Sequence, residues 1–130
     1  MADTLLLADD EAGITALMRQ YFEAAGYRVV CASSGREALE RLSCRPDLIL
    51  LDISMPVCDG LQVLRAIRQQ GLPMIVVMMT AYGSIDGAVT AMKMQADDYI
   101  TKPFDPPDLV EKVEQIRRVR QRMAQLGRPH

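Results

Sequence analysis

Polar side chains that could carry out phosphoryl chemistry follow four separate apolar segments of this 130-residue chain. An acidic pair, Asp9 and Asp10, follows the first of these segments, and the other three are followed by Asp52, Thr80 and Lys102. Carboxylate oxygens are the ligands that Mg²⁺ prefers, and a lysine neutralises phosphate oxygens. A carboxylate can also act as the nucleophile that forms an acyl phosphate. These residue types therefore indicate a site for a divalent cation and a phosphoryl group.

The elements that must position these residues are predicted to be five β-strands separated by amphipathic helices. Strands are predicted at residues 4–8, 28–32, 48–51, 74–79 and 98–101. The middle three are unbroken apolar runs, which is typical of parallel strands covered on both faces. Helices are predicted from Ile14 to Gly26, within 33–42, and over 59–71, 84–94 and 105–126, with Ser34, Asp59 and Asp105 as N-caps.

This strict alternation predicts one three-layer, doubly wound α/β domain with right-handed crossovers. In such sheets, ligands bind at the carboxyl ends of the strands. We therefore expect the acidic pair, Asp52, Thr80 and Lys102 to meet at one edge of the sheet.

Each of these residues also has an ordinary structural explanation. An aspartate after a strand is often a turn residue or a helix cap, Thr80 suits a strand, and Lys102 could be a solvated loop charge. It is their coincidence at four strand ends that favours a site. Four other aspartates are interpreted only as caps and turns: Asp59, Asp86, Asp97 and Asp98. Glu11, which follows the acidic pair, is interpreted only as the start of the first helix.

Composition narrows the class of protein. Hydrophobic residues make up 49% and charged residues 25%, which is typical of a globular domain. A net charge of -2 gives no general basis for binding nucleic acid or an anionic membrane surface. The three cysteines form no CxxC pair, and no leader or membrane-spanning run is recognised, so we expect a cytoplasmic protein. The only histidine, His130, excludes a histidine-based metal site.

Four stretches resemble the receiver domain of bacterial two-component response regulators, the CheY-like superfamily. They are LLLADDE, PDLILLDISMPVCDGLQVL, MIVVMMTAYGS and ADDYITKPFD, in the family order and spanning residues 4 to about 120. The later stretches are most similar to receivers of the nitrogen-regulator type. The resemblance implies a flavodoxin-like sheet of order 2-1-3-4-5 with five helices. It also implies a signalling module that is phosphorylated by a sensor histidine kinase and catalyses only its own phosphorylation and dephosphorylation.

The resemblance assigns roles to the residues at the strand ends. Asp52 corresponds to the phosphoacceptor, and Mg²⁺ is bound by Asp9 or Asp10 (mainly Asp10), by Asp52 and by the backbone carbonyl of Ser54. Lys102 contacts the phosphoryl group.

A second set of residues corresponds to the family's switch. Thr80 moves toward the phosphoryl group, Tyr99 changes rotamer with it, and the peptide bond from Lys102 to Pro103 is cis. The switching surface is the face of the fourth and fifth strands and helices, through which the module controls a partner or an output domain.

The sequence departs from the family pattern in four places. Gln95 stands where glycine is usual, which costs roughly 1–2 kcal/mol if the backbone there is left-handed. Cys58 replaces a common methionine. Ser54 and Tyr82 occupy two positions that tune the lifetime of the acyl phosphate across the family.

The chain is divided into a receiver domain at 1–122 and a C-terminal tail or start of a linker at 123–130. The last helix ends in a basic run, Arg117, Arg118, Arg120 and Arg122, after an apolar seam. The simpler explanation is a solvated helix end; the other is a helical linker to an output domain or a pairing surface for a second subunit. No DNA-binding element is recognised.

Two further functions compete with the signalling module. Haloacid-dehalogenase-like phosphatases also use a nucleophilic aspartate, but they need a second aspartate where this chain has Ser54, and a longer chain. A degenerate receiver that acts without phosphorylation is disfavoured, because every site position is filled.

Overall fold

The computed structural model describes residues 3–55, 58–81 and 85–126. It contains one parallel sheet of five strands in the order β2-β1-β3-β4-β5. The strands are β1 (Thr4–Ala8), β2 (Arg28–Ala32), β3 (Leu48–Asp52), β4 (Ile75–Ala81) and β5 (Asp98–Lys102). The helices are α1 (Ala12–Ala24), α2 (Gly35–Arg41), the short 3₁₀ helix η1 (Leu42–Cys44), α3 (Gly60–Gln69), α4 (Ile85–Lys93) and α5 (Pro106–Leu126). The predicted fold class and strand order are confirmed.

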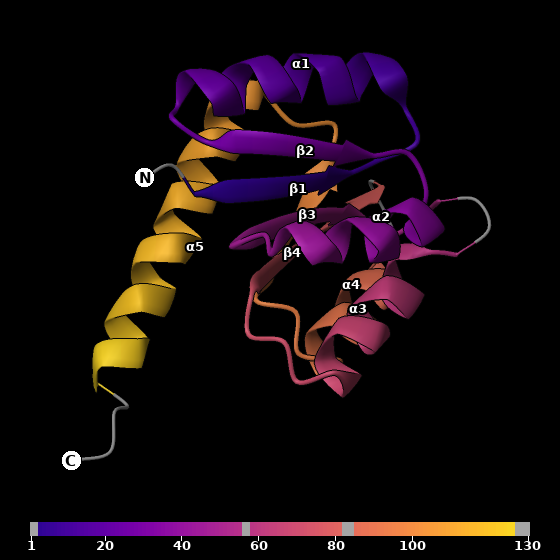
Figure 1. The fold of residues 1–130 in the computed structure, drawn as a ribbon, viewed down its shortest axis with the longest axis vertical. Coiled ribbons are helices and arrows are strands. Elements are labelled where there is room, and N and C mark those ends of the chain that lie inside the picture. Colours follow the sequence, from indigo (N-terminus) through magenta and orange to yellow (C-terminus); the bar gives the residue numbers. More distant parts are fainter. Residues whose placement is uncertain (1–2, 56–57, 82–84, 127–130) are drawn as a thin grey trace.

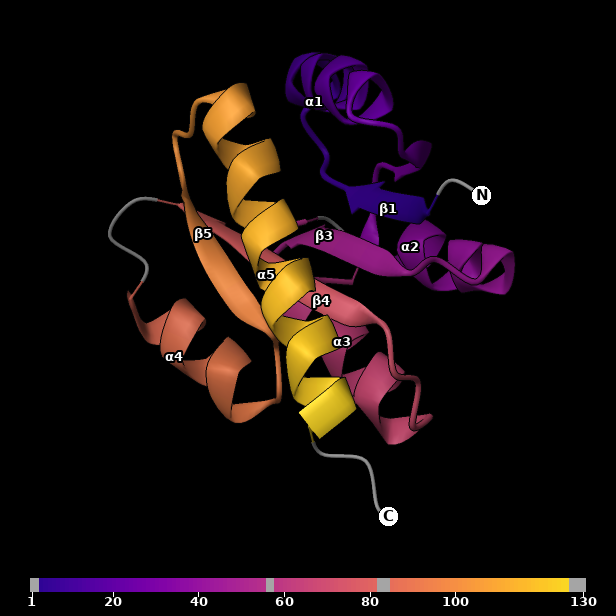
Figure 2. The same ribbon diagram turned by 90° about the vertical axis from the view of Figure 1, so that its left-hand side faces the viewer.

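Two helical layers cover the sheet (Figures 1 and 2). Alternate strand residues point into one layer or the other, since they belong to two separate core clusters. Leu5 and Leu7 of β1 pack with residues of α1 and α5, including Phe22 and Val113. Leu6, between them, packs with residues of α2, α3 and α4. Because both faces are buried, the inner strands are apolar along most of their length, as the sequence indicated.

Helix ends form where the sequence predicts them. The Ser34 hydroxyl accepts a hydrogen bond from the backbone N–H of Glu37 at the start of α2, and Asp59 forms a reciprocal capping box with Gln62 at the start of α3. Past the ends of α1 and α3, the chain turns at Gly26 and Gly71, whose φ angles are 99° and 70°. Both angles lie in the left-handed region, where glycine carries no steric penalty.

The strands run further at their carboxyl ends than the sequence predicted. Asp52, Thr80 and Lys102 lie within β3, β4 and β5 instead of following them. Parallel pairing continues through these residues, since Thr80 aligns with Thr101 and Ala81 aligns with Lys102. Asp52, Thr80 and Lys102 are therefore held at the carboxyl ends of paired strands and not in loops, whereas Asp9 and Asp10 directly follow β1.

Helix α5 is a single 21-residue helix whose second half extends past the sheet (Figure 1). It runs unbroken through the predicted boundary between residues 122 and 123. Val119, Met123 and Leu126 are exposed along this half. Among the described residues, no helix has the length and apolar character needed to span a membrane.

Candidate functional site

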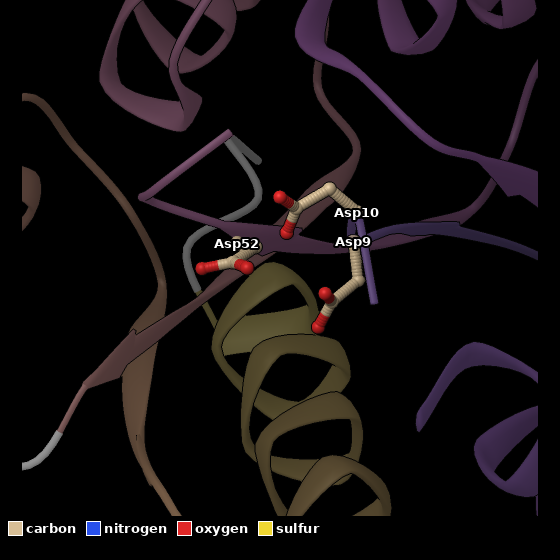
Figure 3. A group of neighbouring side chains, drawn as sticks. All are labelled: Asp9, Asp10 and Asp52. Carbon is tan, nitrogen blue, oxygen red and sulfur yellow. The ribbon is translucent and has the colours of Figure 1, made fainter. Parts of the chain in front are cut away.

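Three aspartates gather where β1 and β3 end, as Figure 3 shows. Asp9 and Asp10 follow β1, and Asp52 is the last residue of the neighbouring strand β3. One carboxylate oxygen from each of the three residues lies within 4.8 Å of the others. The structure therefore brings together the acidic residues that the sequence placed more than forty positions apart.

Lys102 reaches this cluster from the end of β5. Its Nζ donates to Asp9 Oδ2 at 2.7 Å and to Asp52 Oδ2 at 3.1 Å. It also lies 3.4 Å from Oε1 of Glu11, a residue to which the sequence gave only the role of starting α1. The sequence carried no local signal for this contact, because it joins the residue before α1 to the last residue of β5.

Backbone groups hold the two inner carboxylates in place. The Ser54 N–H donates to Asp52 Oδ1 at 3.1 Å, and the Glu11 N–H donates to Asp9 Oδ1 at 2.9 Å. Each carboxylate thus has one oxygen on a backbone donor and the other on Lys102. Both side chains are therefore fixed in orientation before any ligand binds.

Burial makes this concentration of charge costly. Asp9 is 1% exposed and Asp52 is 4% exposed, whereas Asp10 is open to solvent. The pKa of Asp52 is raised to about 6, because burial, together with the negative charge of Asp9, outweighs the opposing effect of Lys102. Burial alone lowers the pKa of Lys102, but its hydrogen bonds to Asp9 and Asp52 outweigh this and leave the pKa above its ordinary value.

The donor set fits a hard divalent cation. Three carboxylates face one lysine, so negative charge is in excess, and all the side-chain donors are oxygens. Mg²⁺ commonly binds through one or two carboxylates and completes its octahedron with water and phosphate oxygens. The exposed Asp10 leaves the cluster accessible from solvent.

The residues assigned to the switch lie on β4, which neighbours the strand of Asp52, and on β5, the next strand beyond it. Thr80 is 2% exposed and comes one position after Met79, which pairs with Asp52 across β3 and β4. Tyr99 is 39% exposed on β5, and the Lys102–Pro103 peptide bond is cis. Tyr82, the other position implicated in acyl-phosphate lifetime, lies outside the described residues.

Sequence reasoning missed a second charged cluster, at the opposite end of the sheet. Asp97, interpreted only as a turn residue, accepts hydrogen bonds from Arg68, from Arg120 and from the backbone N–H of Val76. Arg68 also donates to the carbonyl of Gln95. The motif ADDY was the available signal, but its neighbours come from α3 and α5, which no local pattern connects.

Gln95 has a left-handed backbone, which is the condition under which a residue other than glycine at this position was predicted to be costly. Its φ angle is 71°, so a residue with a Cβ occupies a conformation that glycine adopts without cost. The bond from Arg68 to its carbonyl helps to hold the turn between α4 and β5 in this shape.

The buried carboxylate of Asp52 thus lies beside Asp9, Asp10 and Lys102 at the end of a central parallel strand. The model of the response regulator receiver domain family matches residues 5–114. The chain belongs to this family. The haloacid-dehalogenase-like alternative is not favoured.

Similar proteins agree with this assignment. The chain is 40% identical over 119 residues to the alkaline phosphatase synthesis transcriptional regulatory protein PhoP of Bacillus subtilis, covering 91% of this chain and 50% of that protein. It is 36% identical over 112 residues to the response regulator SaeR of Staphylococcus aureus, covering 86% and 49%. The chain therefore spans about half the length of these curated relatives.

Solved structures extend the likeness to the fold. A CheY-like response regulator receiver domain protein from Methanospirillum hungatei superposes with a TM-score of 0.85 at 30% identity, covering 94% of this chain and 99% of that one. The receiver domain of NtrX from Brucella abortus gives 0.80 at 33% identity, covering 86% and 96%. The second match is in keeping with the resemblance to nitrogen-regulator receivers.

Proposed function

We propose that Asp52 accepts a phosphoryl group from a phosphohistidine of a sensor histidine kinase. The observation that carries this proposal is the placement of Asp52, a buried carboxylate held by Lys102 at 3.1 Å and lying within 4.8 Å of two other aspartates. An oxygen of Asp52 attacks phosphorus, an O–P bond forms, and the N–P bond breaks as the imidazole nitrogen leaves with the electron pair. Lys102 neutralises charge on the phosphoryl oxygens.

The proposed metal ligands are Asp10, Asp9 and Asp52, together with the backbone carbonyl of Ser54. Bound there, Mg²⁺ would neutralise the phosphoryl oxygens. Lys102 alone does not neutralise the three carboxylates. Without a cation, the remaining negative charge of the cluster would repel an incoming phosphate. Asp10 is the principal ligand in this proposal because its exposed carboxylate is the one that makes no bond to Lys102 among those described.

Phosphorylation adds about −1.5 to −2 charges and three acceptor oxygens to this pocket. We propose that Thr80 then donates its hydroxyl to the new oxygens and that Tyr99 changes rotamer in response. Thr80 is buried one residue from the strand neighbour of Asp52, and Tyr99 aligns with Met78 on the adjacent strand. Such a local change of charge can bias a two-state element.

The surface that would report this change is the face formed by α4, β5 and α5. Val89, Met92 and Tyr99 are exposed large side chains on it. We propose that this face contacts an output domain or a second copy of the chain, with 1–122 as the receiver and 123–130 as a tail or the start of a linker. We expect no direct contact between this domain and nucleic acid, since its net charge is -2.

Two further parts of the proposal concern context. We propose that the module catalyses only its own phosphorylation and dephosphorylation and is not an enzyme acting on other substrates. We also propose a cytoplasmic location, which is supported by the free thiols of Cys31, Cys44 and Cys58.

Intact-mass measurement after incubation with acetyl phosphate and Mg²⁺ tests the central assignment. Wild-type protein should gain one phosphoryl group, and Asp52→Asn should gain none. Asp59→Asn is a matched control, because Asp59 caps α3 in the following loop and should leave labelling intact. Equal labelling of wild type and Asp52→Asn would refute the assignment.

A further inference from the structure

Gly35, the first residue of α2, lies against the loop that follows Asp52. A Cβ added to Gly35 would come closer than 3.0 Å to the carbonyl oxygen, the carbonyl carbon and the Cβ of Cys58. Real Cβ atoms essentially never make such contacts, and two of the three atoms are backbone. Cys58 therefore occupies the space that a side chain at position 35 would need. Any residue larger than glycine must displace either the loop or α2.

The described residues that follow Cys58 have little freedom to absorb its displacement. Next to it, Asp59 is fixed in the capping box of α3, and the Gly60 N–H donates to the carbonyl of Ile53 at 2.8 Å. Gly60 is itself packed so closely that a Cβ there would come within 3.0 Å of the Asp52 carbonyl oxygen. Movement at Cys58 consequently reaches the backbone of Asp52 and Ile53 within two residues.

Displacement of α2 would also reach the site. Only Ser33 and Ser34 separate α2 from Ala32, the last residue of β2. The carbonyl of Ala32 accepts a hydrogen bond from the Asp9 N–H at 3.0 Å. Whichever side yields, the backbone of one of the two buried carboxylates shifts.

We propose that Gly35 is a positioning residue for the metal and phosphoryl site, acting through the carbonyl of Cys58. It touches neither ligand. Its role is to let α2 approach the loop so closely that the backbones of Asp52 and Ser54 are held in register with Asp9. This inference rests on the proposed function, because it concerns the geometry of that same site.

The predicted consequence is a loss of Mg²⁺ affinity in Gly35→Ala. Replacing residues that orient metal ligands typically weakens binding by 10–100-fold, and we expect about a tenfold rise in the Mg²⁺ dissociation constant. Isothermal titration calorimetry with Mg²⁺ alone measures this constant without any phosphodonor. Labelling of Asp52 by acetyl phosphate should then require correspondingly more Mg²⁺ for its half-maximal rate.

Two control variants separate positioning from general destabilisation. Ser34→Ala removes the cap of α2 and lowers stability, but it places no atom against the loop and should leave the Mg²⁺ dissociation constant unchanged. Gly13→Ala adds a methyl where no heavy atom lies within 4 Å, and should leave both stability and metal binding intact or improved.

All variants are compared in sucrose, which favours the folded state, with circular dichroism to establish that each is folded. The proposal would be overturned if folded Gly35→Ala had the same Mg²⁺ dissociation constant as Ser34→Ala. Should Gly35→Ala stay unfolded in sucrose, Gly35→Ala in a Gln95→Gly background is measured in its place, under the same criterion. If wild type binds Mg²⁺ but takes no label at Asp52, the proposed function fails while the comparison of Mg²⁺ constants still decides the role of Gly35.

Discussion

The two ends of the sheet both carry buried or half-buried charges, but carboxylates are in excess at one end and arginines at the other. At the carboxyl end, Lys102 pairs with Asp9 and Asp52, and a carboxylate oxygen of Asp10 lies within 4.8 Å of one from each of these aspartates. At the amino end, the carboxylate of Asp97 is shared by two arginines, Arg68 and Arg120. We refer to these as the Asp52 cluster and the Asp97 cluster.

The Asp97 cluster ties four elements together. Asp97 bonds to the backbone of β4 at Val76, Arg68 reaches it from α3, and Arg120 reaches it from α5. Arg68 also donates to the carbonyls of Leu72, Met74 and Gln95, and Arg120 to that of Pro73. Carbonyls that would otherwise lack partners in these turns are satisfied, so this cluster stabilises the fold.

Half of the basic run of α5 is also used in this way. Arg120 belongs to the Asp97 cluster, and Arg117 pairs with Asp3 and Glu114 while its guanidinium lies 5.6 Å from the ring centroid of Tyr27. Arg118 and Arg122 are exposed. The solvated-helix explanation therefore holds for only part of the run, since two of its arginines fasten α5 to the amino end of the sheet.

The Asp52 cluster shows the opposite balance. Excess negative charge and a raised pKa for Asp52 mean that the folded protein holds its site at a cost in stability. A bound cation, or a proton, offsets that cost. The comparison teaches that charge at one end serves the fold, whereas charge at the other end is held ready for a ligand.

The largest expected effect is at the Asp97 cluster. Asp97→Ala leaves two arginines and the Val76 N–H without their carboxylate, and should lower the free energy of unfolding by about 3 kcal/mol in urea denaturation. Arg36→Ala, which breaks an exposed pair with Glu40, is the control and should change it by at most about 0.5 kcal/mol. Equal effects of the two substitutions would abolish the contrast between the ends.

Removing charge from the Asp52 cluster should do the reverse. The pKa of Asp52 is about 6 in the folded state against an ordinary 3.8, so wild type loses stability as pH rises through this interval. In Mg²⁺-free buffer, Asp52→Asn should be more stable than wild type at pH 8, by about 2–3 kcal/mol relative to their difference at pH 3. Urea denaturation across this pH range measures it, with exposed Asp86→Asn as the control. A difference that does not change with pH would show that Asp52 is not under strain from burial.

Mg²⁺ should restore the balance at the carboxyl end. At ten times its dissociation constant, Mg²⁺ should stabilise wild type by about 1.4 kcal/mol, and thermal denaturation should show a higher melting temperature. Asp10→Ala should lose this response and the Mg²⁺ dependence of labelling. An unchanged response in Asp10→Ala would exclude Asp10 as the principal ligand.

The smallest effect is expected at Gln95, in the turn beside the Asp97 cluster. Gln95→Gly relieves the left-handed backbone while keeping the carbonyl that Arg68 bonds, and should raise the free energy of unfolding by about 1 kcal/mol. Gly71→Ala is the reciprocal change at a φ of 70° and should cost a similar amount. A loss of stability in Gln95→Gly would mean that the glutamine side chain contributes to the cluster.

Local patterns accounted for most of the fold and for the members of the Asp52 cluster. Apolar runs, helical stripes and caps such as Ser34 and Asp59 depend on neighbours within a few residues, so their signal is present in the sequence. Strict alternation of strands and helices then forces the carboxyl ends of parallel strands to one edge. From that rule alone, the sequence predicted that Asp9, Asp52 and Lys102 lie close together.

Partnerships between distant segments were not predictable in this way. Asp97 looked like a turn residue, Glu11 like a helix start, and Arg120 like a solvated charge, because their partners lie on other elements and leave no periodic trace.

The sequence by itself determined which residues end the strands and which chemistry their side chains can perform. Only the tertiary structure decided how charge is balanced around them: one lysine for three aspartates at the carboxyl end, two arginines for one aspartate at the amino end. The physical reason is that a pKa and an ion pair depend on burial and on distances of a few ångströms. Those quantities are set by the packing of α2, α3 and α5 on the sheet and not by any residue's neighbours in the chain.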